Sequence, residues 1–163
     1  MEIRKIYQYA LQREYEGKKF FEDNASRLSH AAAVDAFTHL AQEEQKHIEF
    51  IQNQLAVMDQ GGTPDLHVGQ EMQNAGFFSQ RAASESLDQT VYEAMVPDLP
   101  VLRMAYLIER DFAEFYETYA QKVQGESRQV LLMLANWERR HERLFKDMHD
   151  HAFEVYSNMP WGG

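Results

Sequence analysis

Two Glu-x-x-His motifs are the residues of this chain best suited to chemistry: Glu44 with His47, and Glu138 with His141. Residues three apart lie on the same face of a helix, so each motif directs a carboxylate and an imidazole toward one point. Of the seven histidines, only these two have a glutamate three residues before them. The two motifs therefore predict two metal-binding positions on two helices.

A further glutamate precedes each motif at almost the same distance. Glu14 lies 30 residues before Glu44, and Glu109 lies 29 residues before Glu138. Four carboxylates and two imidazoles in this order are the ligands of a two-metal site inside a four-helix bundle. The predicted metal ligands are Glu14, Glu44, His47, Glu109, Glu138 and His141. We predict no catalytic residue beyond these ligands.

Both intervals fold at their midpoints. The first midpoint is Ser29, within a break in the helical pattern at 26–29, and the second lies beside Gly125, which predicts a helix end. A hairpin folded at its midpoint brings the two ends of the interval to the same height, roughly 22 Å from the turn at 1.5 Å per residue. Each hairpin therefore delivers one glutamate and one Glu-His pair to the same level.

The elements that must position these residues are long helices, since none of the four prolines interrupts the periodic segments. The predicted helices span residues 3–27, 31–59, 99–123 and 126–155. Residues 3–59 and 98–155 form an internal repeat, in which an offset of 95 or 94 aligns the apolar positions. The segment between the halves, with a short extra helix at about 79–95, is long enough to cross the bundle. We expect an all-α, ferritin-like four-helix bundle with a long crossover, forming one domain over 1–163.

An isolated Glu-x-x-His motif is usually a solvated helix face. Here both motifs lie in apolar stripes, with Leu40 and Ile48 beside the first and Leu134 and Leu144 beside the second. Burying four carboxylates without partners would cost many kcal/mol or keep them protonated. Metal cations resolve this conflict, so the pattern favours a metal site.

The ligand types indicate which metal is expected. Carboxylates with one imidazole per ion suit iron or manganese. The absence of cysteine leaves little reason to expect structural zinc, although zinc or cobalt could occupy such a site. We expect two iron ions. By the symmetry of the repeat, two glutamates bridge the ions and one Glu–His pair completes each position: bridges Glu44 and Glu138, pairs Glu14–His47 and Glu109–His141.

The composition narrows the classes of function. The chain has 163 residues, no cysteine and a net charge of -10, so a basic nucleic-acid-binding surface is not expected. No apolar run approaches the roughly 20 residues of a membrane span, and the N-terminus does not resemble a signal peptide. We expect a cytoplasmic protein that binds neither nucleic acid nor a membrane.

The remaining polar residues are expected on solvated faces. These are Glu43, Glu114, Glu117 and Glu142, together with His149, Asp150 and His151 near the end of the last helix. Aromatic residues at helical spacing, such as Tyr7 and Tyr116, are expected in the core or around the site.

The four helices resemble those of the rubrerythrin family, within the ferritin-like superfamily. The resemblance is carried by the residues around Glu14, LeuAlaGlnGluGluGlnLysHis at 40–47, IleGluArgAspPheAlaGluPheTyr at 108–116 and LeuAlaAsnTrpGluArgArgHis at 134–141. It implies a non-haem di-iron site that reacts with peroxide or oxygen, a homodimer, and a role in oxidative stress.

Two features depart from that family. Full-length members carry a rubredoxin-like domain with four cysteines, which passes electrons to the iron; this chain has no cysteine, so we expect a separate electron donor. They also place a further glutamate one turn after the third-helix ligand, where this sequence has Phe112. The remaining six-ligand set is similar to a ferroxidase-type centre.

Three functions remain open at this point. The one we favour is a di-iron oxidoreductase that reduces peroxide or oxygen with electrons from a separate donor protein. The second is a ferritin-type ferroxidase that handles iron, for which a storage role would favour a closed shell over a dimer. The third is a helical interaction module whose metals only stabilise the fold and are redox-silent.

Overall fold

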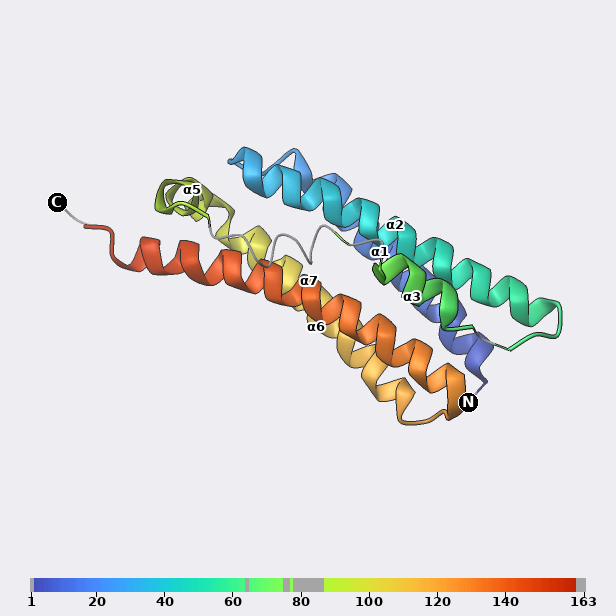
Figure 1. Cartoon of the computed structure of the whole chain (residues 1–163). Helices are drawn as coiled ribbons and strands as arrows, with labels where there is room; N and C mark the ends of the chain where they lie inside the picture. Colours follow the sequence, from blue (N-terminus) through green and yellow to red (C-terminus); the bar gives the residue numbers. More distant parts are fainter. Residues whose placement is uncertain (1, 64, 75–76, 78–86, 161–163) are drawn as a thin grey trace.

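Two helical hairpins lie side by side and form the bundle (Figure 1). The first consists of α1 (Ile3–Ala25) and α2 (Ala31–Asp59), and the second of α6 (Leu99–Ala120) and α7 (Gly125–Ser157). The computed structural model describes residues 2–63, 65–74, 77 and 87–160, and no strand occurs among them. The predicted all-α class is confirmed.

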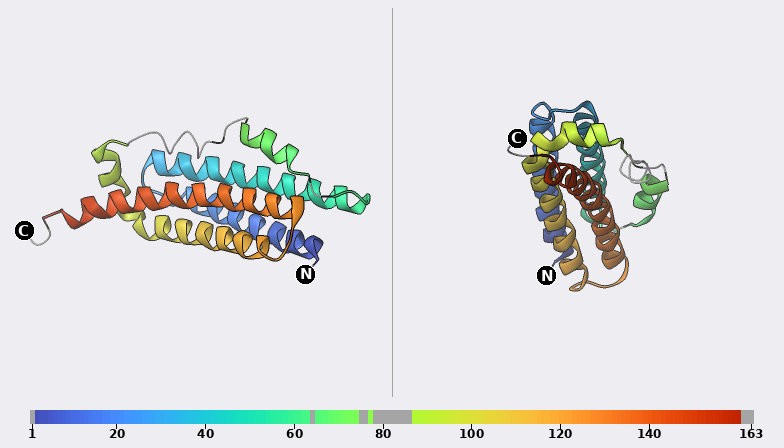
Figure 2. Two further views of the ribbon diagram at one scale, coloured as in Figure 1. Left: turned by 60° about the horizontal axis from the view of Figure 1, so that its bottom comes forward. Right: turned by 90° about the vertical axis from the view of Figure 1, so that its left-hand side faces the viewer.

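The connection between the hairpins is a crossover. Helices α2 and α6 both run from left to right in Figure 1, and the left view of Figure 2 agrees. A chain that leaves α2 at one end of the bundle must therefore return along its length to begin α6. The described part of this return contains α3 (His67–Asn74), α5 (Gln89–Met95) and the short turn η1 (Val96–Asp98). This arrangement is consistent with a ferritin-like bundle.

The predicted helix ends were close, with one wrong assignment. Helix α2 has the predicted bounds, and α6 ends at Ala120 instead of 123. Gly125 was predicted to end the third helix. In the structure it is instead the first residue of α7. Its φ of 67° is a left-handed conformation that glycine adopts without steric cost. The glycine therefore allows the chain to reverse direction at the start of α7, not at the end of α6.

The crossover differs in part from the prediction. The extra helix predicted at about 79–95 is present in its C-terminal part as α5, while residues 78–86 lie outside the described residues. Helix α3 was not predicted. It packs closely on the bundle through Gly69, where a Cβ atom would come within 2.1 Å of Cε of Met133. A side chain at this position would therefore have to displace the end of the Met133 side chain.

Two polar contacts fix the ends of the crossover. The buried side-chain amide of Gln54 donates to the carbonyl of Asp65 at 3.0 Å and accepts from its backbone N–H at 2.7 Å. At the other end, both carboxylate oxygens of the buried Asp98 accept from the backbone N–H of Ser29 at 3.0 Å. The second contact ties the α1–α2 turn to the start of α6.

The apolar core consists of two clusters. One contains Ile6, Phe50 and Trp137, and the other contains residues such as Phe37 and Phe145, whose rings lie 5.2 Å apart. On every long helix, the predicted ligands fall in sequence between the members of the two clusters. The bundle therefore holds a polar layer between two apolar ones.

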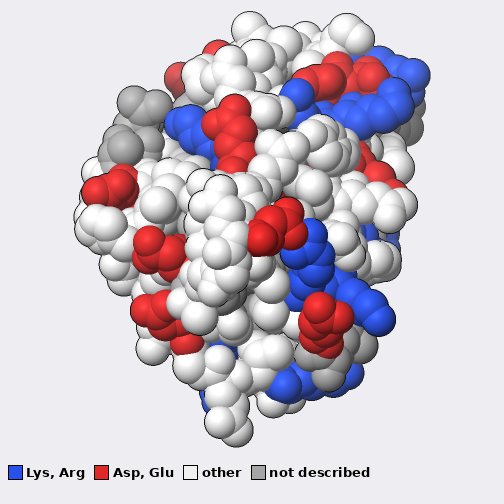
Figure 3. All heavy atoms as spheres, turned by 90° about the vertical axis from the view of Figure 1, so that its right-hand side faces the viewer, with Lys and Arg blue, Asp and Glu red and all other residues white. Residues whose placement is uncertain are grey.

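The charges of the surface are mixed where they can be seen. The right-hand end of the molecule carries basic and acidic side chains next to one another (Figure 3). This face presents no large patch of one sign. Within the described part of the chain, no helix is long and apolar enough to cross a membrane.

Candidate metal centre

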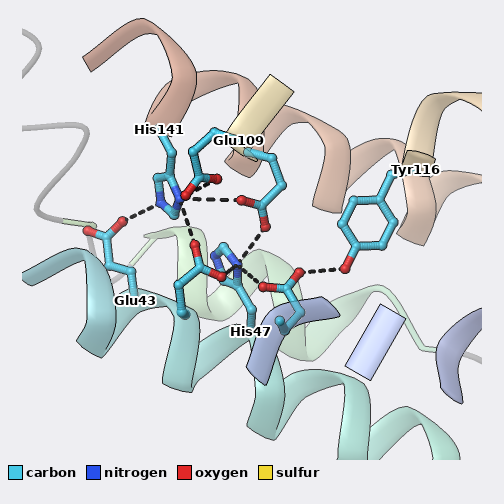
Figure 4. Close-up of polar contacts among 8 residues, drawn as sticks. Glu43, His47, Glu109, Tyr116 and His141 are labelled. Atoms are coloured by element: carbon cyan, nitrogen blue, oxygen red, sulfur yellow. Dashed lines mark hydrogen bonds and ion pairs between the residues drawn. The ribbon is translucent and has the colours of Figure 1, made fainter. Parts of the chain in front are cut away.

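The predicted ligands converge in the middle of the bundle, with at least one from each long helix (Figure 4). All of them are at most 1% exposed: Glu14, Glu44, His47, Glu109, Glu138 and His141. Their helices bury them because each lies on an apolar stripe that faces the opposite hairpin. The two imidazole rings lie nearly parallel, at an interplanar angle of 6° and with centroids 5.3 Å apart.

These residues form two overlapping clusters, each with ligand atoms within 4.8 Å of one another. The first consists of Glu14, Glu44, His47 and Glu138, and the second of Glu44, Glu109, Glu138 and His141. Glu44 and Glu138 belong to both clusters. The structure thus divides the residues as the repeat predicts, and two carboxylate–histidine clusters that share two carboxylates fit a dinuclear metal site.

Unpartnered buried atoms provide a test of this fit. Both oxygens of Glu109 and of Glu138, and Oε2 of Glu14, have no hydrogen-bond partner among the residues that the structure describes. Nδ1 of His47 lies 2.9 Å from Oε1 of Glu138, yet neither atom is aligned for a hydrogen bond. Buried polar atoms are rarely left in this state. Lone pairs that converge without donors between them are what cations require, so the residues present fit the metals.

The carboxylates divide into two kinds by pKa. Burial, together with the charges of Glu138 and Glu44, raises the pKa of Glu14 well above its usual value. Burial and the same two carboxylates raise the pKa of Glu109 in the same way. Burial acts in that direction on Glu138 too, but the charge of His47 and the close polar contacts with His141 and His47 outweigh it and hold the pKa of Glu138 well below normal.

The two histidines balance the remaining negative charge. Burial alone would lower the pKa of His47, but the charges of Glu138, Glu44 and Glu14 raise it well above normal. The pKa of His141 is raised in the same manner, chiefly by Glu109 acting against burial. Without metal, the raised pKa values of Glu14, Glu109, His47 and His141 favour a proton on each of them, and four protons would make the cluster of six residues neutral. Two divalent cations would keep it neutral by displacing four protons.

Glu43 is the functional residue that the sequence analysis assigned wrongly. It was expected on a solvated face, but it is only 2% exposed, and its Oε2 lies 2.8 Å from Nε2 of His141. The carboxylate accepts from this nitrogen and leaves Nδ1, 3.0 Å from Glu44, to face the cluster. A signal was present, since Glu43 lies three residues after Leu40 and four before His47, on the inner stripe of α2.

Tyr116 is a second residue that contacts the cluster. Its hydroxyl donates to Oε1 of Glu14 at 2.5 Å, across the bundle from α6 to α1. Burial and the charge of Glu14 raise the pKa of Tyr116 well above normal, so the phenol remains a donor. The expectation that Tyr116 lies in the core or around the site is confirmed.

Aromatic rings from α7 and the crossover cover His47. The indole of Trp137 stacks on its imidazole at 4.9 Å, and Phe77 meets it edge-on at 6.1 Å. The indole N–H of Trp137 donates to Gln73 of α3 at 3.4 Å. The crossover thus excludes water from this side of the cluster.

On another side, Phe112 fills the space beside Gly17. A Cβ atom on Gly17 would lie 2.7 Å from the ring of Phe112 and 3.9 Å from Oε2 of Glu44. Arg13 lies over the ring at 5.0 Å. These three residues line a surface pocket of about 220 Å³ between α1 and α6. Gly17 therefore lies between this pocket and the carboxylate of Glu44.

The other expected surface glutamates differ among themselves. Glu114 is exposed, whereas Glu142 is 8% exposed and accepts from Arg110 and Arg139, both at 2.7 Å. Arg139 also pairs with Glu117 at 2.8 Å. These ion pairs join α6 to α7 beside the cluster, so two of the four residues expected to be only solvated support the second hairpin.

Near the end of α7, the His149, Asp150 and His151 segment does not form a metal site in the structure. The ring of His149 packs against Tyr106 and that of His151 stacks on Tyr92 at 4.9 Å. Among the described residues, the two clusters at the centre of the bundle are the groups that could hold a metal ion.

Comparison with known proteins agrees with this geometry. The family model for rubrerythrin matches residues 100–159, which comprise nearly all of α6 and α7 and include Glu109, Glu138 and His141. No curated protein and no solved structure matches the chain. Residues 100–159 thus form a rubrerythrin-family domain, and with the first hairpin they build a ferritin-like bundle around carboxylate–histidine sites of the di-iron type.

Proposed function

We propose that this protein is a non-haem di-iron oxidoreductase, which reduces peroxide or oxygen with electrons from a separate donor. Glu44 and Glu138 would bridge the two ions in this proposal. Glu14 with His47 would complete one metal position, and Glu109 with His141 the other. The observation that supports it most is that both clusters share the same two buried carboxylates.

When bound, two ferrous ions would supply two electrons to the oxidant. Reduction of peroxide to two waters by two electrons also consumes two protons. Tyr116 holds a proton next to the cluster, on the phenol oxygen that donates to Oε1 of Glu14. The aromatic cover of Trp137 and Phe77 keeps bulk water out, which strengthens electrostatic interactions within the site.

The electron donor is proposed to be a different protein. This chain has no cysteine, so it offers no thiolate ligands for an iron–sulfur or rubredoxin-type centre. Electrons would have to reach the cluster from outside the chain.

The test is anaerobic reconstitution with ferrous iron, followed by addition of peroxide or oxygen. We expect two irons per chain and an increase in visible absorbance as they are oxidised. Glu109→Ala should lower the iron content, whereas Glu114→Ala is the matched control on the exposed side of the same helix. Iron that binds at two per chain but does not react with either oxidant would overturn the oxidoreductase proposal.

A ferroxidase is the second candidate, and one observation favours it. Phe112 is 4% exposed and lies one turn after Glu109, so the centre has six protein ligands without a further carboxylate at this position. The two candidates differ in their oxidant and assembly. Faster reaction with peroxide than with oxygen would favour the first, and a closed shell that retains oxidised iron would favour the second.

A further inference from the structure

The internal repeat gives both metal positions the same ligands, but the residues behind these ligands differ. An offset of 94 aligns Glu43 with Trp137, each directly before a shared glutamate. An offset of 95 aligns Phe21 with Tyr116. One half of the repeat therefore has a carboxylate where the other has an indole, and a phenyl ring where the other has a phenol.

Of the two histidines, His141 is the one with a carboxylate hydrogen-bonded to the ring nitrogen that faces away from the cluster. The carboxylate of Glu43 lies 2.8 Å from its Nε2 and is itself buried. A hydrogen bond from the distal nitrogen of a histidine to a carboxylate fixes the tautomer and raises the basicity of the nitrogen that faces a metal. Nδ1 of His141 is thus held toward Glu44, Glu109 and Glu138 at 3.0 to 3.4 Å.

His47 lacks this support. In place of a carboxylate it meets the ring of Trp137, stacked at an interplanar angle of 25°. The polar hydrogen of Trp137 points to Gln73. Nε2 of His47 is buried and has no hydrogen-bond partner in the described part of the chain. No described residue behind the ring therefore raises the basicity of His47.

The carboxylates Glu14 and Glu109 also differ, and this difference again favours metal binding at the position formed by Glu109 and His141. Tyr116 donates to Oε1 of Glu14 and withdraws negative charge from that oxygen. The equivalent residue in the other half, Phe21, has no hydroxyl. Within the described ranges, both oxygens of Glu109 lack hydrogen-bond partners and remain available to a cation. Glu109 is thus the stronger ligand of the pair.

Gly17 lies beside the position formed by Glu14 and His47. It lines the surface pocket between α1 and α6, and a Cβ atom on it would be 3.9 Å from Oε2 of Glu44. That oxygen is the one 3.5 Å from Nδ1 of His47, while Oε1 of Glu44 faces His141. An ion between Glu14 and His47 would therefore lie on the side of Glu44 that faces Gly17.

We propose that the two metal positions are unequal, and that the one formed by Glu109 and His141 fills first. The position formed by Glu14 and His47 fills second and exchanges its metal more readily. This inference rests on the proposed function only in taking the six residues as metal ligands. Outer hydrogen-bond partners typically change metal affinity by roughly 10- to 100-fold, which is the difference expected between the two positions.

The test is titration of the metal-free protein with cobalt(II), followed by visible absorbance and native mass spectrometry. Neither measurement depends on enzymatic activity. We expect two binding steps with affinities that differ by roughly 10- to 100-fold. His141→Ala should remove the tighter step and His47→Ala the weaker one. The reverse assignment would overturn the proposal.

Variants of Glu43 and Tyr116, which contact the ligands, separate the two causes of the difference in affinity. Glu43→Gln should weaken the tighter step by about 10-fold or more and leave the weaker step in place. Tyr116→Phe should strengthen the weaker step, because Glu14 regains its full charge. Tyr7→Phe is the matched control. It also removes a buried phenol oxygen, but this oxygen, unlike that of Tyr116, has no hydrogen-bond partner among the described residues. Circular dichroism of each variant verifies that it is folded.

The outcomes also distinguish this inference from the proposed function. Two cobalt ions bound with equal affinity, unaffected by Glu43→Gln, would overturn the inference and leave the di-metal proposal intact. Failure of the folded protein to bind cobalt would overturn both. Two unequal steps in a protein whose iron form does not react with peroxide or oxygen would support the inference and overturn only the oxidoreductase proposal.

Discussion

The ring of Phe112 occupies the space that Gly17 leaves open, so closely that a Cβ atom on the glycine would lie 2.7 Å from Cε2 of the ring. The two residues are equivalent in the internal repeat, since an offset of 95 aligns them. One half of the repeat supplies a large side chain and the other supplies its space. The pair therefore packs α1 against α6 beside the shared carboxylate of Glu44.

Gly17→Ala should destabilise the protein by about 1–3 kcal/mol, because the added methyl group overpacks this contact. Chemical denaturation of the metal-free protein measures this change. The Phe112→Leu background is the control, since a smaller side chain should reduce the cost of the alanine. Equal costs in both backgrounds would show that Phe112 is not the residue that restricts position 17.

Glu138→Ala should impair both metal positions, because Glu138 belongs to both clusters. His47→Ala removes a member of only one cluster and should leave about one metal per chain. Metal analysis after reconstitution and gel filtration measures the difference. If Glu44→Ala or Glu138→Ala retained two tightly bound metals, the assignment of these residues as bridges would be wrong.

Much of this arrangement could be predicted from the sequence because ligand spacing and helix periodicity are local properties. Nearly equal intervals, of 30 residues from Glu14 to Glu44 and 29 from Glu109 to Glu138, fix the hairpins, and the bounds of α2 were predicted without error. The division of the cluster residues followed from the same repeat. These features depend on residues within one hairpin or on the symmetry between two.

The features that the sequence did not reveal depend on contacts between distant segments. Glu43 becomes a partner of His141 only when the two hairpins pack, 98 residues apart in sequence. Helix α3 has eight residues and a glycine in its middle, so its helical pattern is weak by itself. It is stabilised by packing on the bundle through Gly69. Neither the contact of Glu43 with His141 nor the surface on which α3 packs can therefore be predicted from the neighbouring sequence.

Asp98→Ala should lower stability by about 1–3 kcal/mol without changing the metal content. The substitution removes the acceptor for the backbone N–H of Ser29, and this contact lies at the α1–α2 turn, remote from the cluster. Thermal unfolding and metal analysis provide the two measurements. Asp98→Asn keeps one acceptor oxygen and should cost less. A loss of bound metal in Asp98→Ala would mean that the crossover end also positions the ligands.

The pH dependence of stability should reverse between the metal-free and metal-loaded protein. In the metal-free fold, the pKa values of Glu14, Glu109, His47 and His141 are all raised. In the unfolded chain these groups titrate near about 4.3 for glutamate and about 6.5 for histidine. Above those values the folded state binds more protons than the unfolded state, so its stability must fall as pH rises.

We therefore expect the Tm of the metal-free protein to decrease steadily from pH 6 to pH 9. Glu44 and Glu138 do not oppose this trend, because their pKa values are lowered and their contribution is lost only under acid conditions. Metal replaces the protons, so the loaded protein should instead lose stability as pH falls and protons compete for the ligands. Calorimetry of both forms across this range measures the two slopes. A metal-free Tm that is constant or rises between pH 7 and pH 9 would mean that the buried cluster does not hold these protons.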